Sequence, residues 1–266
     1  MSLAAKGGIA LVVVASSVTG GYFLFNPGTK ETKHVSVLSS LSNLNLAYES
    51  GKFGNDYSKY MVDPNNPDNE WWWNKVYANF VEDTTNSEKN SKLSTEFKNV
   101  STIDKAYAKS TDNNSNKALN QVCDAAFKDE ESKWTSKNYY VENVWTYCSI
   151  FNKKYIFVNS SSYTNKLGGD AQHKNKALST NNSDNQSLWD LRNKEFIGEG
   201  NKTGTGAISS EGSVFSELYA KRSTTLSDDS IKQTCQKAYD ILTNAGTTSP
   251  KATHEDIKKF CYLMPE

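Results

Sequence analysis

The chain has 266 residues, enough for one or two domains, and its 30 basic residues balance 30 acidic ones. All the basic residues except Arg192 and Arg222 are lysine, which argues against a nucleic-acid surface, because paired hydrogen bonds to phosphate or guanine favour arginine. Aromatic residues make up 12% of the chain and can build a core, so the low apolar content of 36% does not indicate global disorder.

The first element predicted in chain order is a membrane-spanning helix. Uncharged residues run from Gly7 to Thr29, and their firmly apolar part, Ile9 to Phe25, would span roughly 25 Å as a helix against a hydrocarbon core of about 30 Å. We therefore assign residues 1–29 to a single-pass signal-anchor in the lipid bilayer, with the bulk of the chain outside the cell. Two alternatives remain: a cleaved signal peptide, although no clear A-x-A site is present, and a buried helix of a soluble protein.

Three consecutive tryptophans lie at the start of a second predicted helix. Val76 and Phe80 follow Trp73 at the i+3 and i+7 positions, which is the helical stripe that faces a core. Trp73 is therefore predicted as a core anchor. Trp71 and Trp72 point elsewhere on the helix, so they either cover a neighbouring loop or serve as exposed aromatic residues that contact a partner.

The sequence repeats itself after about 112 residues. Three segments recur in the same order, each with matching apolar residues, tryptophan or cysteine. The pairs of segments are WNKVYANF (73–80) with WDLRNKEF (189–196), YAKSTDNNSNKALNQVCDAAF (107–127) with YAKRSTTLSDDSIKQTCQKAY (219–239), and VENVWTYC (141–148) with HEDIKKFC (254–261).

This duplication predicts a mainly α fold. After the membrane helix we expect two tandem, mainly helical repeat modules, residues 30–150 and 151–266. Residues 35–48 are expected to add a helix and residues 153–159 a short strand, so minor β content is included in the prediction.

The four cysteines fall at matching positions, two in each module. Their symmetry predicts structural disulfides within each module, Cys123 with Cys148 and Cys235 with Cys261, each joining two short helices. The alternative is a pair of reduced cysteines packed in each core. The pairing depends on the extracellular placement of the chain, because disulfides persist in oxidising compartments.

Residues with the pattern of a catalytic or metal site are not found. The chain contains no H-E-x-x-H, G-x-S-x-G or Walker A sequence, and the glycine-rich stretch at 198–206 is predicted as a surface loop. Zinc is not expected, since there is no C-x-x-C and His34, His173 and His254 are scattered along the chain. The sequence therefore predicts a protein that is not an enzyme and that binds no cofactor.

Short motifs of the chain resemble those of one group of proteins. The chain begins MSLAAKGG ahead of its apolar segment, and each module has an aliphatic residue four positions before a cysteine, in LNQVC and IKQTC. Tyr147 and Phe260 each precede the second cysteine of their module. The combination resembles the paralogous, uncharacterised membrane-anchored surface proteins of haemotropic mycoplasmas, in which tryptophan is more common before that cysteine.

The resemblance implies a protein without an assigned activity, held in the single membrane of a wall-less cell. Large paralogous sets imply variable surface antigens or proteins that contact a host protein. Our hypothesis is accordingly a non-enzymatic, displayed surface protein. The alternative is a ligand-binding module that captures a nucleotide or haem on aromatic surfaces between the repeats, lined by Trp71, Trp72 and Trp134.

Overall fold

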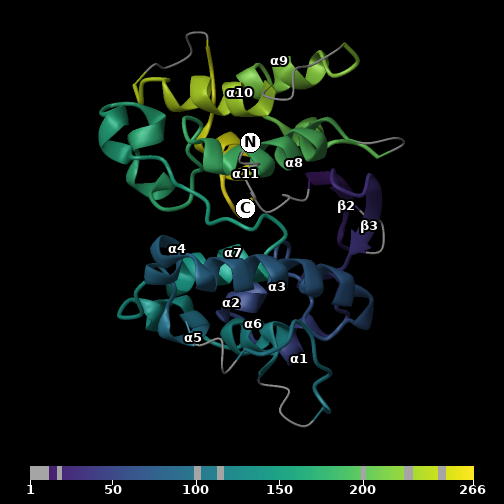
Figure 1. Ribbon diagram of the computed structural model, residues 1–266. Helices are drawn as coiled ribbons and strands as arrows, with labels where there is room; N and C mark the ends of the chain where they lie inside the picture. The colour runs from purple at the N-terminus through teal and green to yellow at the C-terminus, as the bar shows by residue number, and fades with distance from the viewer. Residues whose placement is uncertain are drawn as a thin grey trace, which may run out of the picture. The chain divides into compact units, whose positions relative to one another are not determined.

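The computed structural model describes residues 12–16, 20–98, 103–112, 117–198, 202–224, 230–244 and 250–266. These residues are mainly helical, with one small antiparallel sheet, so the predicted mainly α class is confirmed (Figure 1). The chain divides into two compact units, Met1–Lys154 (unit 1) and Tyr155–Glu266 (unit 2). Each unit is described by itself below.

Unit 1 begins with a three-stranded antiparallel sheet in the order β1-β2-β3 (Figure 1). Leu24 and Tyr22 of β2 are buried, whereas Phe23 between them is exposed, as the two-residue period of a strand requires. Val35 pairs with Tyr22 and is also buried. The strands are β1 (Val12–Ser16), β2 (Tyr22–Asn26) and β3 (Glu31–Val35).

This sheet includes part of the segment that was predicted as a membrane helix, so that prediction is not met in the described residues. Gly20 and Gly21 have φ values of 82° and 124°, which end any helix and turn the chain between β1 and β2. A Cβ atom on Gly21 would lie 2.2 Å from the carbonyl oxygen of Val35, so only glycine fits there. Residues 1–11 and 17–19 of the predicted anchor lie outside the described ranges.

Within the described ranges, each helix is too short or too polar to span a bilayer.

The helices of unit 1 pack around a core of large aromatic side chains. Trp73, Phe80 and Val76 of α3 are buried, as the stripe on that helix predicted. The α-helices are α1 (Leu44–Ala47), α2 (Phe53–Asp56), α3 (Glu70–Thr85), α4 (Ser87–Ser91), α5 (Thr95–Lys98), α6 (Leu119–Phe127) and α7 (Tyr140–Cys148). Short 3-10 helices lie at Leu38–Ser40, Pro67–Asn69 and Glu131–Trp134.

Unit 2 is built from helices and 3-10 turns. Thr253 and Asp256 form a capping box at the start of α11. Residues 153–159 do not form the predicted strand, because only Phe157 pairs, in an isolated bridge to Leu178. The α-helices are α8 (Gln186–Ile197), α9 (Val214–Ala220), α10 (Ser230–Tyr239) and α11 (His254–Cys261). Short 3-10 helices lie at Ser160–Tyr163, Leu167–Gly169, Ala171–His173, Ser183–Asn185 and Thr205–Ile208.

The two units share a pattern of backbone hydrogen bonds around the end of their last helix. In each, two extended segments that are distant in sequence meet the chain where that helix ends. The matching bonds run from Val62 N to Cys148 O and from Leu178 N to Cys261 O (3.0 and 2.9 Å), from Asp63 N to Ser36 O and from Ser179 N to Ile156 O (3.0 and 2.8 Å), and from Ile150 N to Tyr60 O and from Leu263 N to Lys176 O (3.1 and 2.9 Å).

A fully buried asparagine stands four residues before the anchoring tryptophan in each unit. Asn69 exchanges two hydrogen bonds of 2.9 Å with the backbone of Ser36. Asn185 exchanges two, of 2.8 and 2.7 Å, with the backbone of Ile156. The second N–H of each amide reaches another carbonyl, in the segment just before the tryptophan helix. Because one acceptor and both donors of each amide are used, these side chains fix the entry to α3 and α8.

The aromatic contacts of the two cores also match. In each unit the aromatic residue before the second cysteine receives one ring edge-on and a second ring at a shallow tilt. The edge-on pairs are Phe80 with Tyr147 and Phe196 with Phe260 (centroids 5.4 and 5.2 Å apart, both at 85°), and the tilted pairs are Phe97 with Tyr147 and Phe215 with Phe260 (5.5 and 5.0 Å, at 33° and 35°).

A buried glycine in each unit lies directly against the aromatic end of a helix. Gly54 is in KFGND (52–56), and an added Cβ would stand 2.6 Å from the Cβ of Phe127. Gly168 is in KLGGD (166–170), and its added Cβ would stand 2.7 Å from the Cβ of Tyr239. Both aromatic residues end a helix that carries a cysteine, so the glycines allow close approach of backbone to helix.

We predict that Gly54→Ala and Gly168→Ala each lower the free energy of unfolding by about 1–3 kcal/mol, because the new methyl group overpacks against an atom next to the helix backbone. Denaturant unfolding of each variant measures this.

The matched control is Gly51→Asn. Gly51, the residue directly before KFGND, has a φ of 81° and open space around it. Asn165, the residue directly before KLGGD in unit 2, has a φ of 59°. Asparagine tolerates this left-handed conformation, so the control is expected to stay within about 0.5 kcal/mol of the wild type. Alanine variants as stable as the control would contradict the close packing.

Candidate functional site

Both predicted disulfides are formed. Cys123 joins Cys148 with Cα atoms 5.7 Å apart, and Cys235 joins Cys261 with Cα atoms 5.8 Å apart. They connect α6 to α7 and α10 to α11, and all four cysteine side chains are fully buried. Closing loops of 25 and 26 residues contributes on the order of 3 kcal/mol each in the chain-entropy model. Stability is therefore the direct effect of these bonds.

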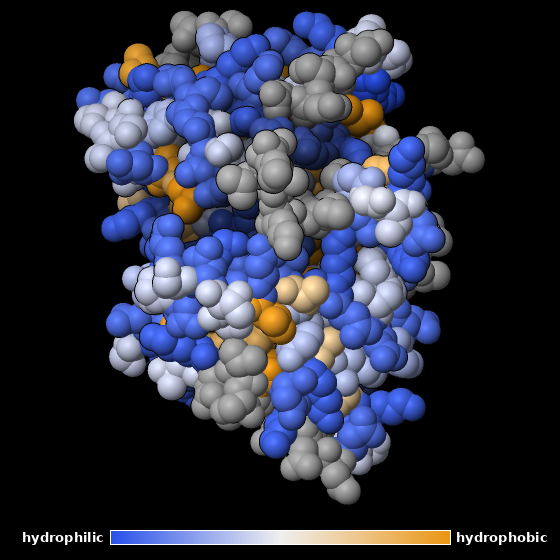
Figure 2. All heavy atoms as spheres, viewed as in Figure 1, coloured by the Kyte–Doolittle hydropathy of each residue, from blue (hydrophilic) through white to orange (hydrophobic). Residues whose placement is uncertain are grey.

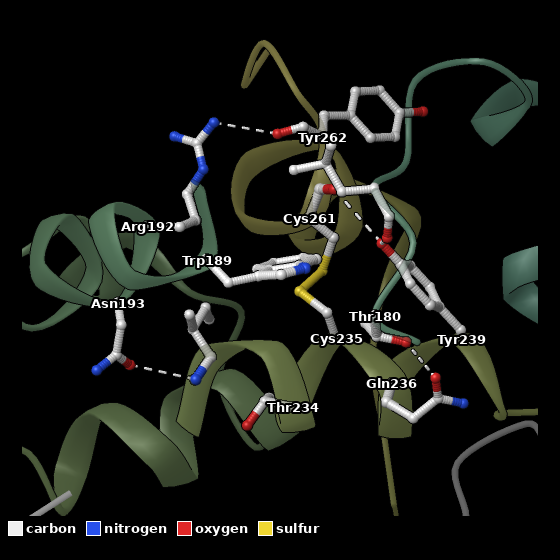
Figure 3. The surroundings of a disulfide bond; sticks show 12 residues. Thr180, Trp189, Arg192, Asn193, Thr234, Cys235, Gln236, Tyr239, Cys261 and Tyr262 are labelled. Carbon is white, nitrogen blue, oxygen red and sulfur yellow. Dashed lines mark hydrogen bonds between the residues drawn. A yellow bond between two sulfur atoms is a disulfide. The ribbon is translucent and has the colours of Figure 1, made fainter. Parts of the chain in front are cut away.

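Large side chains and polar contacts enclose the disulfide of unit 2 (Figure 3). Trp189 of α8 lies in these surroundings and donates its indole N–H to the carbonyl of Ser179 at 3.0 Å. The hydroxyl of Tyr239 donates to the carbonyl of Leu178 at 3.0 Å. Burial of this phenol raises its pKa well above the ordinary value, so it stays protonated. The surroundings are those of a structural bond.

Trp71 and Trp72, predicted as contact aromatics, have different environments. Trp72 is fully buried and packs edge-on against Trp73, with centroids 4.7 Å apart, so its assignment as a contact residue is wrong. Trp71 is half-buried and donates its indole N–H to the carbonyl of His34 at 3.1 Å. It therefore covers the neighbouring strand.

Trp71 also lines a small cavity between α3 and the sheet. The cavity measures about 170 Å³, and Lys33 lies with its Nζ 5.9 Å from the centroid of the Trp71 ring. Burial lowers the pKa of Lys75, which lines the same cavity one turn after Trp71 on α3. Trp134, the third tryptophan of the predicted ligand surface, is buried against Phe53 with centroids 4.8 Å apart. The structure does not bring the three tryptophans together into one exposed surface.

The face of the molecule in Figure 2 is mostly hydrophilic, with apolar atoms in small separate groups. The most exposed large apolar side chains of the described residues are Leu46, Ile208 and Leu242. They come from distant parts of the sequence. Apolar residues exposed singly are normal for a protein surface and do not define a binding patch.

Two histidines that are far apart in the sequence meet in unit 2. The sequence described them as scattered, yet Nε2 of His173 lies 2.9 Å from Nδ1 of His254. His173 is buried in the 3-10 turn Ala171–His173, and His254 is the first residue of α11. Their separation of 81 residues explains why no local motif revealed the pair.

The hydrogen bonds of this cluster fix the position of each proton. The Tyr262 hydroxyl donates to the carbonyl of Gln172 at 2.9 Å, so its oxygen accepts from Nδ1 of His173 at 2.7 Å. Nε2 of neutral His173 then accepts from Nδ1 of His254. Nε2 of His254 remains, facing Asp170 with its Oδ2 3.9 Å away.

The histidine geometry favours a hydrogen-bonded pair over a metal chelate. The ring centroids are 5.1 Å apart while the nitrogens are 2.9 Å apart, so the rings point at each other nearly end to end. Two histidines that share a metal instead direct their nitrogens at one point about 2.0–2.1 Å from each. Among the described residues, no group of three or more histidine, cysteine, aspartate or glutamate side chains is placed to hold a metal ion.

Comparison of the chain with protein-family models, curated proteins and solved structures finds no match.

Burial, and then the charge of His254, lowers the pKa of His173 from its ordinary 6.5 to about 4. The folded protein therefore keeps His173 neutral in a range where the unfolded chain binds a proton. The stability that this neutral form contributes is fully present above about pH 6.5 and is lost as the pH falls towards 4. We expect a loss of about 3 kcal/mol across that window, at about 1.4 kcal/mol per pH unit.

The measurement is the free energy of unfolding of the wild type and of His173→Gln between pH 4 and 7. Glutamine cannot take up a proton, so the difference between the two proteins isolates His173 from the carboxylates that titrate in the same range. Equal slopes for both proteins would show that His173 is not held neutral.

Proposed function

We propose that the protein is displayed on the outer face of a cell membrane, as two copies of one disulfide-linked helical module, and that its role is non-enzymatic. The observation that carries the proposal is the pair of buried disulfides, Cys123–Cys148 and Cys235–Cys261, at corresponding places in the two units. Disulfides form and persist in oxidising surroundings such as the cell surface and are rare in a reducing cytosol.

Duplication of an ancestral module accounts for the arrangement within the units. The matching backbone bonds, buried asparagines, glycines and aromatic pairs involve residues far apart in sequence, which chance would not place alike twice. The loops between these matched residues differ in length and composition. A fixed scaffold that carries variable loops suits contact with a host protein or antigenic variation, because surface loops tolerate sequence change.

The resemblance to the membrane-anchored surface proteins of haemotropic mycoplasmas supports the same role. Those proteins share the aliphatic residue four positions before the first cysteine and an aromatic residue before the second, which here are Leu119 and Tyr147 in unit 1. Leu119 is fully buried and Tyr147 is nearly so, which agrees with a role in a scaffold.

The apolar segment Gly7 to Thr29 is proposed as the membrane signal-anchor. In this proposal the segment leaves the β1–β2 pairing and forms a helix when it enters lipid. A helix satisfies its backbone hydrogen bonds internally, whereas the edge strand of an open sheet leaves some of them unsatisfied. Val14 lies inside the apolar run, four residues before its centre, and its side chain is half-buried in the sheet. A charged side chain at that position therefore destabilises the membrane helix more than it destabilises the sheet.

Capture of a nucleotide or haem, the alternative function, has less support. Trp72 and Trp134 are buried, and the cavity that Trp71 borders is small for either ligand.

The first prediction tests the external location. On intact cells, an impermeant amine-reactive biotin is expected to label the lysines of the protein and not those of a cytosolic control. Alkylation in denaturant without reductant should modify none of the four cysteines, and a second alkylation after reduction should modify all four. Denaturant is needed because the native cysteines are buried. Four thiols free before reduction, with lysines protected until lysis, would overturn the proposal.

The second prediction tests the anchor. The wild type should stay with the membrane fraction during alkaline carbonate extraction, and Val14→Lys should shift the protein into the soluble fraction, because a lysine inside a membrane helix is costly, by up to about 3 kcal/mol at the centre. Lys30→Ala, at the end of the apolar segment, is the control and should behave as the wild type. Equal extraction of wild type and Val14→Lys would contradict anchoring by this segment.

A further inference from the structure

A polar cavity of about 350 Å³ lies in unit 1 beside the start of α7. Its wall comes from two segments, residues 91–98, which include α5, and residues 136–139, which lead into α7. The volume is in the range of small-molecule sites. Thr95, Ser136 and Asn138 of this wall are exposed, so a ligand in the cavity can reach their hydroxyl and amide groups.

Tyr139 borders the cavity in a backbone conformation that is unfavourable for a large side chain. Its φ is 61° and its ψ is 2°. Of the four other non-glycine residues with a positive φ in the described ranges, three are asparagines, which tolerate it, and the fourth is Lys30 in a turn. Tyr139 is nevertheless 46% exposed, so burial of its ring in the core does not compensate for the strain.

Unit 2 begins the corresponding helix without this strain. Because residues 141–148 align with residues 254–261, Tyr139 corresponds to Ala252. Ala252 has no positive φ, and Thr253 caps α11 with a φ of −103°. The module therefore needs neither a left-handed residue nor an exposed ring at this place. Strain that the fold does not require is a sign of function.

The wall of the cavity is held by a frame that both units share. Oδ1 of Asn143 on α7 accepts from the backbone N–H of Ser94 at 2.7 Å, and its Nδ2 donates to the carbonyl of Lys92 at 3.2 Å. In unit 2, Oδ1 of Asp256 accepts from the backbone N–H of Ser210 at 2.8 Å. The segment before α5 is thus fixed against α7 without a ligand, which lowers the entropic cost of binding one.

The groups around the cavity match a ligand that carries several hydroxyl groups. Hydroxyl and amide side chains both donate and accept hydrogen bonds, as the hydroxyls of a sugar do. Charge does not dominate, because Nζ of Lys137 pairs with Glu96 at 3.1 Å across the two segments. The exposed ring of Tyr139 supplies an apolar surface. A sugar ring combines hydroxyl groups with an apolar face of C–H groups.

We propose that this cavity binds a saccharide, with the C–H face of one sugar ring against Tyr139 and its hydroxyls hydrogen-bonded to Thr95, Ser136 and Asn138. The site gives the surface role a ligand class, the glycans of the surface that the protein contacts, and to that extent it rests on the proposed function. Binding by the purified chain does not depend on where the protein is displayed.

The binding experiment applies the full chain, detected through a C-terminal tag, to a glycan array with neutral and acidic terminal sugars. We expect saturable binding to a subset of the glycans, competed by the methyl glycoside of their terminal sugar at roughly millimolar concentration. Lys98 also lines the cavity and would attract a carboxylate. Bound glycans that end in sialic acid would identify an acidic sugar, and those that end in galactose or N-acetylglucosamine a neutral one. No saturable binding to any glycan would overturn the inference.

Tyr139→Gly separates a ligand contact from a structural role. Glycine adopts a positive φ without steric cost, so the variant should keep or raise the Tm while its binding falls at least about tenfold. Tyr139→Phe keeps the ring and should bind within about twofold of the wild type. Unchanged binding in Tyr139→Gly, or a Tm lowered by more than about 4 °C, would overturn the assignment of the ring to a ligand.

Asn175→Gly in unit 2 is the matched control. Asn175 is exposed, has a φ of 57° and lies outside the cavity, so the same exchange should leave binding unchanged. Asn138→Ala is expected to weaken binding about fivefold without a change in Tm, because its side chain is exposed. An empty glycan array together with lysine labelling on intact cells would overturn the saccharide site and leave surface display standing.

Discussion

The disulfide between two short helices is the constraint on which each unit depends. Helices of eight to ten residues, such as α10 and α11, are marginal alone because nucleating a helix is costly. The bond between Cys235 and Cys261 holds the pair, and the carbonyl of the second cysteine then anchors an extended segment through Leu178. Asn185 joins the same segment to the tryptophan helix. Removing the disulfide would therefore loosen the segment as well as the helices.

The sequence predicted the features that depend on spacing within one segment. The stripe through Trp73 and the positions of the four cysteines are local patterns, and both are present in the structure. The sheet at the start of unit 1 was not predicted, because an apolar run of valine and phenylalanine satisfies a membrane helix and buried strands equally. The formation of strands and not a helix depends on Gly20 and Gly21 and on pairing with residues 31–35, which hydropathy does not measure.

The candidate sites depend on contacts between distant segments, so sequence patterns revealed little of them. Trp72 belongs to the core only because other elements cover that side of α3, and His173 meets His254 only after folding. The exchange of Arg192 for Val76 could have been read from the aligned tryptophan segments. Its meaning required the structure, because only there does the arginine stand against the carbonyls beyond α11. The two units thus share matching backbone bonds and aromatic contacts and differ in their polar interior.

The distribution of tryptophan makes the two units optically unequal. Trp189 is the single tryptophan of unit 2, and it lies in the surroundings of the Cys235–Cys261 bond (Figure 3). Disulfides quench nearby indole emission by accepting an electron from the excited state. The other five tryptophans belong to unit 1, so its emission dominates the native spectrum. Melting followed by fluorescence therefore reports mainly on unit 1, and Trp189 is the single tryptophan that reports on unit 2.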